Sequence, residues 1–131
     1  MLYKGYSVLT KPRILRHLGL IYNSAQAIYP FIICPGYIIN ESNNFQYLSI
    51  LEHEATHLDR AKKFGILKWY LLYIFSPKFR LKEEVIAYRV KKKFLESKGV
   101  LFDVEKHARI LSSNIYGKVV KYEEAVRLLS S

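Results

Sequence analysis

The sequence His53-Glu54-Ala55-Thr56-His57 lies at the centre of a stretch, 45–65, in which apolar residues recur at helical spacing. Two histidines four positions apart stand about 40° from each other around a helix, because each residue advances by roughly 100°. Both imidazoles can therefore reach one metal ion from the same face. Glu54 lies beside that face, where a carboxylate can act as a general base on a metal-bound water without being a ligand.

The residues around this motif predict a helix over 43–64. Asn43 and Gln46 resemble a capping pair, with Ser42 as a second candidate for the N-cap. Gly65 is a suitable C-terminal stop. The predicted helix carries an apolar stripe for a core, made of Leu48, Leu51, Ala55 and Leu58.

A catalytic zinc site needs a third protein ligand and an open position. In the metzincin pattern a glycine follows the second histidine by three residues and a third histidine follows it by six. Arg60 and Lys63 occupy these positions here, which excludes that pattern. The other histidines, His17 and His107, have no supporting motif.

A carboxylate on a second predicted helix, 77–98, is the better candidate for the third ligand. Glu84 shares one helix face with the apolar positions Leu81, Val85 and Tyr88, whereas Glu83 is expected to turn toward solvent beside Lys82. An inward carboxylate is costly unless a positive group meets it. Zinc would meet that need, and so would one of the 21 lysines and arginines of the chain.

With Glu84 and Ala87 forming Glu-x-x-Ala after HExxH, residues 30–98 resemble the gluzincin metallopeptidases, and most closely the minigluzincins. The resemblance implies a small α+β fold, zinc ligands His53, His57 and Glu84, and Glu54 as the base that activates a zinc-bound water for peptide hydrolysis. Many gluzincins have Asp where this chain has Tyr88, so the partner that orients a ligand histidine is open. Minigluzincins are latent, which would make residues 100–131 the obstructing segment.

The first forty residues are expected to be rich in β-structure. Residues 1–10 give a weak strand signal, and 31–34 and 37–40 read as two strands about a turn at Pro35-Gly36. In gluzincin-like folds an edge strand binds the substrate in extended form, and this hairpin is the natural candidate. Residues 13–20 read as a short helix or an irregular basic segment.

The apolar segment 66–75 is too short to cross a bilayer, which needs about 20 residues. We expect a buried connecting helix, with interfacial membrane contact through Trp69, Tyr70 and Tyr73 as the alternative. Ser76 and Pro77 then predict the start of the glutamate helix. Two more helices, about 103–114 and 121–130, are expected on either side of Gly117.

The composition of the 131-residue chain predicts one domain. The single cysteine, Cys34, excludes an intramolecular disulfide and favours a buried thiol in a cytoplasmic protein, with zinc coordination as the alternative. His107 or Tyr116 could hydrogen-bond an oxyanion if either reached the site. The expected partner is a peptide or protein substrate. The net charge of +10 keeps a second class open, a basic module that binds nucleic acid or anionic membranes.

Overall fold

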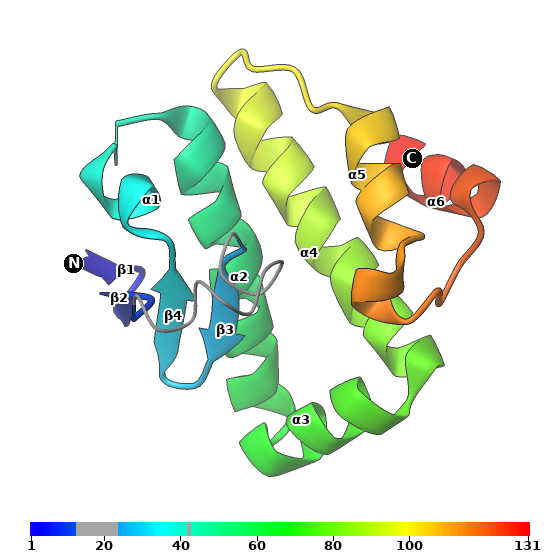
Figure 1. The fold of residues 1–131 in the computed structure, drawn as a ribbon, viewed down its shortest axis with the longest axis horizontal. Helices are drawn as coiled ribbons and strands as arrows, with labels where there is room; N and C mark the ends of the chain where they lie inside the picture. Colours follow the sequence, from blue (N-terminus) through cyan, green and yellow to red (C-terminus); the bar gives the residue numbers. More distant parts are fainter. Residues whose placement is uncertain (13–23, 42) are drawn as a thin grey trace.

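The computed structural model describes residues 1–12, 24–41 and 43–131 and shows a mixed α+β fold, as the sequence predicts (Figure 1). A small sheet packs against one long helix, a short helix lies beside the sheet, and the helices that follow the long helix continue on its other side. The expected segment 13–20, with His17, and the cap candidate Ser42 lie outside the described residues.

The sheet has the strand order β1-β2-β4-β3 among the described residues. β2 and β4 run parallel, whereas the outer strands pair antiparallel with them. Ile32 and Cys34 of β4 are fully buried, because alternate residues of a strand face the same side. β3 is an edge strand and contacts the long helix. The strands are β1 (Leu2–Tyr3), β2 (Tyr6–Thr10), β3 (Gln26–Ile28) and β4 (Phe31–Cys34).

The prediction of a hairpin about Pro35-Gly36 is wrong, because residues 37–40 belong to a short helix, α1 (Gly36–Asn40). Ile38 of this helix is buried in the core beneath the sheet, so tertiary packing overrides the strand preference of β-branched residues. The hairpin that forms instead pairs β3 with β4 around a turn at Tyr29-Pro30.

The motif helix, α2, runs from Phe45 to Phe64. Its N-cap is Asn44, whose side chain accepts a hydrogen bond from the Gln46 backbone, rather than Asn43 or Ser42 as expected. The helix begins two residues later than predicted for this reason. Gly65 ends it as predicted, with a φ of 111° that disfavours any side chain, and α3 (Ile66–Phe75) follows at once.

The glutamate helix, α4 (Pro77–Ser97), starts as predicted, with the Ser76 side chain accepting from the Phe79 backbone. α5 (Val104–Leu111), a 3₁₀ turn η2 (Asn114–Tyr116) and α6 (Tyr122–Ser130) follow, close to the expected bounds. The last helices share a core with α4 that is separate from the core beneath the sheet. Its buried members include Val85, Leu95, Leu111 and Leu129.

The expectation of a buried connecting helix holds for only one face of α3. Trp69 is its buried residue, whereas Leu67, Leu71, Ile74 and Phe75 are exposed. No helix within the described residues is both long and apolar enough to cross a membrane.

Candidate metal centre

α2 and α4 lie side by side and bring together the three residues that the sequence predicts as ligands (Figure 1). Nε2 of His53 lies 3.1 Å from Oε2 of Glu84, and Nε2 of His57 lies 3.1 Å from Oε1. The two Nε2 atoms are 3.2 Å apart. All three side chains are buried, so three ligand atoms converge on one point in the interior.

This arrangement could bind a metal ion. Ligand atoms about 2.0–2.2 Å from a tetrahedral ion lie roughly 3.3–3.6 Å from one another, slightly farther apart than these atoms are. Without a cation, one Nε2 at most can donate to the other. With a cation, the lone pairs of both imidazoles and the carboxylate point to the same place. Two neutral nitrogens and one carboxylate are a donor set that suits zinc.

The protonation states of the triad fit this interpretation for two of the residues. Burial lowers the pKa of His53 to about 4, which keeps this imidazole neutral. Burial would raise the pKa of Glu84, but His57 and His53 hold it well below its ordinary value. Burial would lower the pKa of His57, but Glu84 outweighs burial and raises it. A cation and a proton would therefore compete for His57.

Glu54 lines the same cavity of about 500 Å³ as the triad. Its removal from bulk water raises the pKa of the carboxyl to about 7, although His57 opposes this shift. The backbone N–H of Ala27 in β3 donates to it. The predicted base thus lies next to the predicted ligands. Its pKa is close to neutral pH, so at neutral pH the carboxyl group can both take up and release a proton.

The imidazoles have no acceptor for their second nitrogens within the described residues. Nδ1 of His53 and Nδ1 of His57 are buried and lack hydrogen-bond partners. Aromatic rings contact them instead: Tyr88 packs edge-on against His53 at 4.4 Å between centroids, and Trp69 lies 5.5 Å from His57. Tyr88, at the position where many gluzincins have Asp, therefore contacts the candidate ligand His53 through its ring.

Tyr73 of α3 is a site residue that sequence reasoning missed. Its hydroxyl donates to Oε1 of Glu84, and its ring stacks on Trp69. The spacing of Trp69, Tyr70 and Tyr73, which places three aromatic rings on one helix face, was the signal that could have pointed to it.

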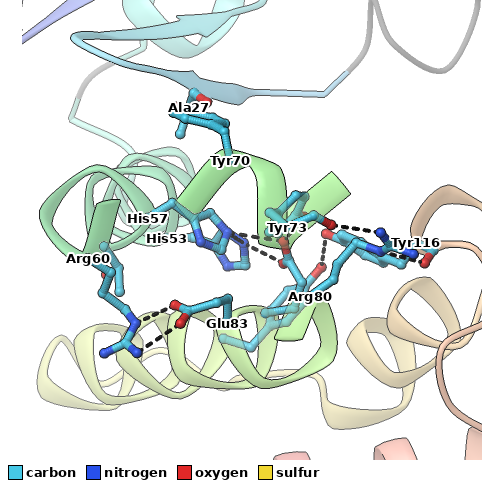
Figure 2. A network of polar contacts seen from close by, with 12 residues as sticks. Ala27, His53, His57, Arg60, Tyr70, Tyr73, Arg80, Glu83 and Tyr116 are labelled. Carbon is cyan, nitrogen blue, oxygen red and sulfur yellow. Dashed lines mark hydrogen bonds and ion pairs between the residues drawn. The ribbon is translucent and has the colours of Figure 1, made fainter. Parts of the chain in front are cut away.

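The prediction that Glu83 turns toward solvent is wrong, because the residue is buried and only 1% exposed. Both of its oxygens accept from the guanidinium of Arg60 on α2 (Figure 2). The neighbouring carboxylates of α4 therefore have separate partners, a guanidinium for Glu83 and the two imidazoles for Glu84. Pairing with a lysine or arginine was the alternative to zinc for Glu84, and it is Glu83 that forms such a pair, with Arg60.

The free edge of β3 faces the cavity and is covered by a tyrosine. The hydroxyl of Tyr70 accepts from the Tyr29 N–H at 2.8 Å and donates to the Ala27 carbonyl at 3.0 Å. Strand β3, rather than the expected hairpin at Pro35-Gly36, is the edge strand beside the candidate centre.

The two candidate oxyanion donors lie in different places. Tyr116 lines the cavity, and its hydroxyl is 3.1 Å from that of Tyr88. His107 packs between Tyr88 and Phe102 instead, with its Nδ1 2.7 Å from the Asp103 carbonyl. Within the described residues, the C-terminal segment contributes Tyr116 and its neighbour Ile115 to the lining of the cavity.

Comparisons of this chain with protein-family models, curated proteins and solved structures gave no match. The resemblance to gluzincins thus rests on the motif residues, and the structure adds that His53, His57 and Glu84 lie close enough together to hold a metal ion.

Proposed function

We propose that the protein is a zinc-dependent peptide hydrolase of gluzincin type, located in the cytoplasm. His53, His57 and Glu84 hold the metal, and Glu54 is the general base. The observation that carries the proposal is the convergence of three buried ligand atoms, 3.1–3.2 Å apart, with a fourth titratable group, Glu54, in the same cavity. The chemistry supplied at such a centre is Lewis acidity, which lowers the pKa of water and polarises a carbonyl group.

Glu54 performs the proton transfers in this proposal. A carboxylate with a pKa of about 7 can take a proton from water as the water attacks a carbonyl carbon, and can then give that proton to the leaving amine. Tyr73 holds the Glu84 carboxylate in position. Tyr116 is the hydroxyl from the C-terminal segment that could donate to a developing oxyanion.

The edge of β3 is the proposed binding place for an extended peptide. Backbone groups of Ala27 and Tyr29 point to this edge, and a peptide could add to them as a further strand. The Tyr70 hydroxyl now occupies these groups. A peptide that pairs here must therefore displace Tyr70, which favours a second candidate, a zinc-binding domain without turnover.

Metal content tests the site itself. We expect protein purified without chelators to contain close to one zinc ion per chain, and Glu84→Gln to lose most of it. Glu83→Gln is the matched control, because it changes the adjacent buried carboxylate while leaving all three ligands in place. Folded wild-type protein that neither contains zinc nor takes it up would overturn both candidates.

Glu54→Gln separates the two candidates. It removes the base but no ligand, so zinc content should be unchanged, and hydrolysis of a mixed peptide library should fall by about 10²–10⁴-fold. Hydrolysis that proceeds equally in Glu54→Gln would show that the proposed mechanism is wrong. Zinc-loaded wild-type protein that cleaves nothing in the library would favour the domain without turnover.

A further inference from the structure

The two faces of α3 differ in their surroundings. Trp69 is buried, and Tyr70 and Tyr73 turn toward the candidate metal centre. The opposite face is apolar and open to solvent, with Leu67 and Phe75 exposed by 74% and 77%. Leu67, Leu71 and Phe75 recur at i, i+4 and i+8, which places them on one side of the helix. Ile74, which is 60% exposed, lies at the margin of this face and also lines the cavity of the candidate centre.

This exposed apolar face lies at one end of the molecule, where α3 joins α2 to α4 (Figure 1). Monomeric proteins rarely expose contiguous apolar side chains of this size without a binding role. Phe64 and Ile66, at the junction with α2, are also exposed.

The charges beside the apolar face are all positive. No acidic residue occurs between Asp59 and Glu83 in the sequence. Arg60 and Arg80 are engaged internally, by Glu83 and by backbone carbonyls. The exposed lysines that remain in this stretch lie before α3, on α3 itself and after it: Lys62, Lys63, Lys68, Lys78 and Lys82.

We propose that α3 docks on an anionic lipid surface, with its axis along the membrane plane and its outer face between the headgroups. A short helix with an apolar face bordered by lysines is the pattern that binds interfaces, because apolar burial and attraction to anionic headgroups act together. A second copy of this chain fits less well, since a symmetric contact would bring the same lysines against each other. The candidate metal centre lies on the opposite face of the same helix.

Vesicle sedimentation tests the proposal with the full chain. We expect binding to phosphatidylcholine vesicles that contain about a third phosphatidylserine, weaker binding to pure phosphatidylcholine, and release at high salt. Leu67→Ser/Phe75→Ser should weaken binding by about tenfold or more, because it removes the most exposed apolar side chains. Leu101→Ser, at a residue that is 86% exposed elsewhere, is the matched control and should bind like wild type.

The charge contribution has its own matched pair. Lys62→Gln/Lys63→Gln/Lys68→Gln should weaken binding by about tenfold, and Lys93→Gln/Lys106→Gln/Lys121→Gln, with the same charge change at exposed lysines elsewhere on the chain, should weaken it far less. Equal losses in the two triple variants would overturn the proposal, because net charge alone would then explain binding. The absence of binding to anionic vesicles would overturn it as well.

A tryptophan on the outer face of α3 reports the orientation. Trp69 is the only tryptophan of the chain but is buried on the inner face, so the reporter is the double variant Trp69→Phe/Phe75→Trp. Brominated phosphatidylcholine in the anionic vesicles should quench the fluorescence of this variant when it is bound. Bound variant without quenching would show that another face docks and would overturn the proposal. These readouts involve no metal or hydrolysis, so their failure would leave the proposed function untouched.

Discussion

The hydroxyl of Tyr73 donates to the same carboxylate that faces the two imidazoles, so one side chain of α3 controls how Glu84 is held. A donor to a ligating carboxylate limits its rotation and reduces the entropy lost when a metal binds. Tyr73 also stacks on Trp69, which contacts His57, and thereby links two of the three ligands.

Replacing Tyr73 by Phe should therefore weaken zinc binding by about 10–100-fold, the usual effect of removing an outer partner of a metal ligand. Tyr70→Phe is the control, because it removes a hydroxyl from the same helix that contacts β3 rather than a ligand. Competition with a fluorescent zinc chelator measures both affinities. Equal affinities for wild type and Tyr73→Phe would show that the contact does not position Glu84.

The residues of the site differ in how well the sequence predicts them. His53, Glu54 and His57 follow from helix periodicity alone, because spacing on one helix fixes their relative directions. Glu84 follows from its apolar neighbours. Tyr73 could not be predicted as a partner of Glu84, since the turns at Gly65 and Ser76 set the direction of α3 and no periodicity describes them.

At the scale of elements, an ion pair between Arg60 of α2 and Glu83 of α4 joins these two helices in addition to the triad. Glu83 is almost fully buried, whereas about a third of the Arg60 side chain is exposed. The pair is therefore asymmetric. Removing Arg60 would leave a buried carboxylate without a partner, and that is more costly than leaving a half-solvated guanidinium.

Arg60→Ala should lower the free energy of unfolding by about 3 kcal/mol, as expected when one member of a buried pair is removed. Arg127→Ala, which breaks a fully solvated surface pair with Glu124, should leave it nearly unchanged. Urea unfolding followed by circular dichroism gives both values. Similar small losses in the two variants would show that water reaches Glu83.

The helices of this fold are more predictable than its strands. Gly65, Ser76 and Pro77 have local preferences that decide where helices end and begin. Residues 37–40 form a helix against their β-branched composition, because Ile38 fills a buried place against α2 and the sheet. Contacts between distant parts of the chain therefore determine that this segment is a helix, and the local sequence pattern does not predict such contacts.

For the whole molecule, the existence of two cores changes the meaning of residues 100–131. Leu111 and Leu129 are fully buried against α4, and Arg89 and Lys92 donate to the last carbonyls of α6. The C-terminal segment is thus part of the fold, and it reaches the candidate site only through its 3₁₀ turn.

Removing residues 100–131 should therefore abolish cooperative folding rather than release activity. The truncation would expose Leu95 and Val85, which are buried beneath α5 and α6. Thermal melting of the truncated chain tests whether cooperative folding is lost. Tyr116→Phe, which changes the segment only at the cavity, is the comparison that keeps the segment in place. A cooperative transition near the wild-type temperature would show that the segment is separable, as an obstructing segment must be.

The stability of the whole chain should fall on mild acidification, partly through His107. Burial, with Lys91 nearby, lowers the pKa of His107 to about 4 from 6.5. The unfolded chain then binds a proton between these values and the folded chain does not, so the stability is complete above pH 6.5 and is lost as the pH falls toward 4.

His107→Asn should reduce the loss of stability between about pH 7 and pH 5 by about 2 kcal/mol. His53, whose pKa is also about 4, remains in both proteins, so the difference reports His107. Urea midpoints at the two pH values give the comparison. An equal loss in both proteins would show that His107 titrates normally in the folded chain.

His53 and Glu84 are separated by only 31 positions, and α3 connects the helices that carry them. A cation between them would act as a reversible cross-link across a short loop, comparable to a disulfide that can be removed with a chelator. The cross-link would restrict the unfolded chain as well as the folded one. All of its parts leave the ribosome before α5 and α6 do, so the metal could hold α2 against α4 while the second core is still being synthesised.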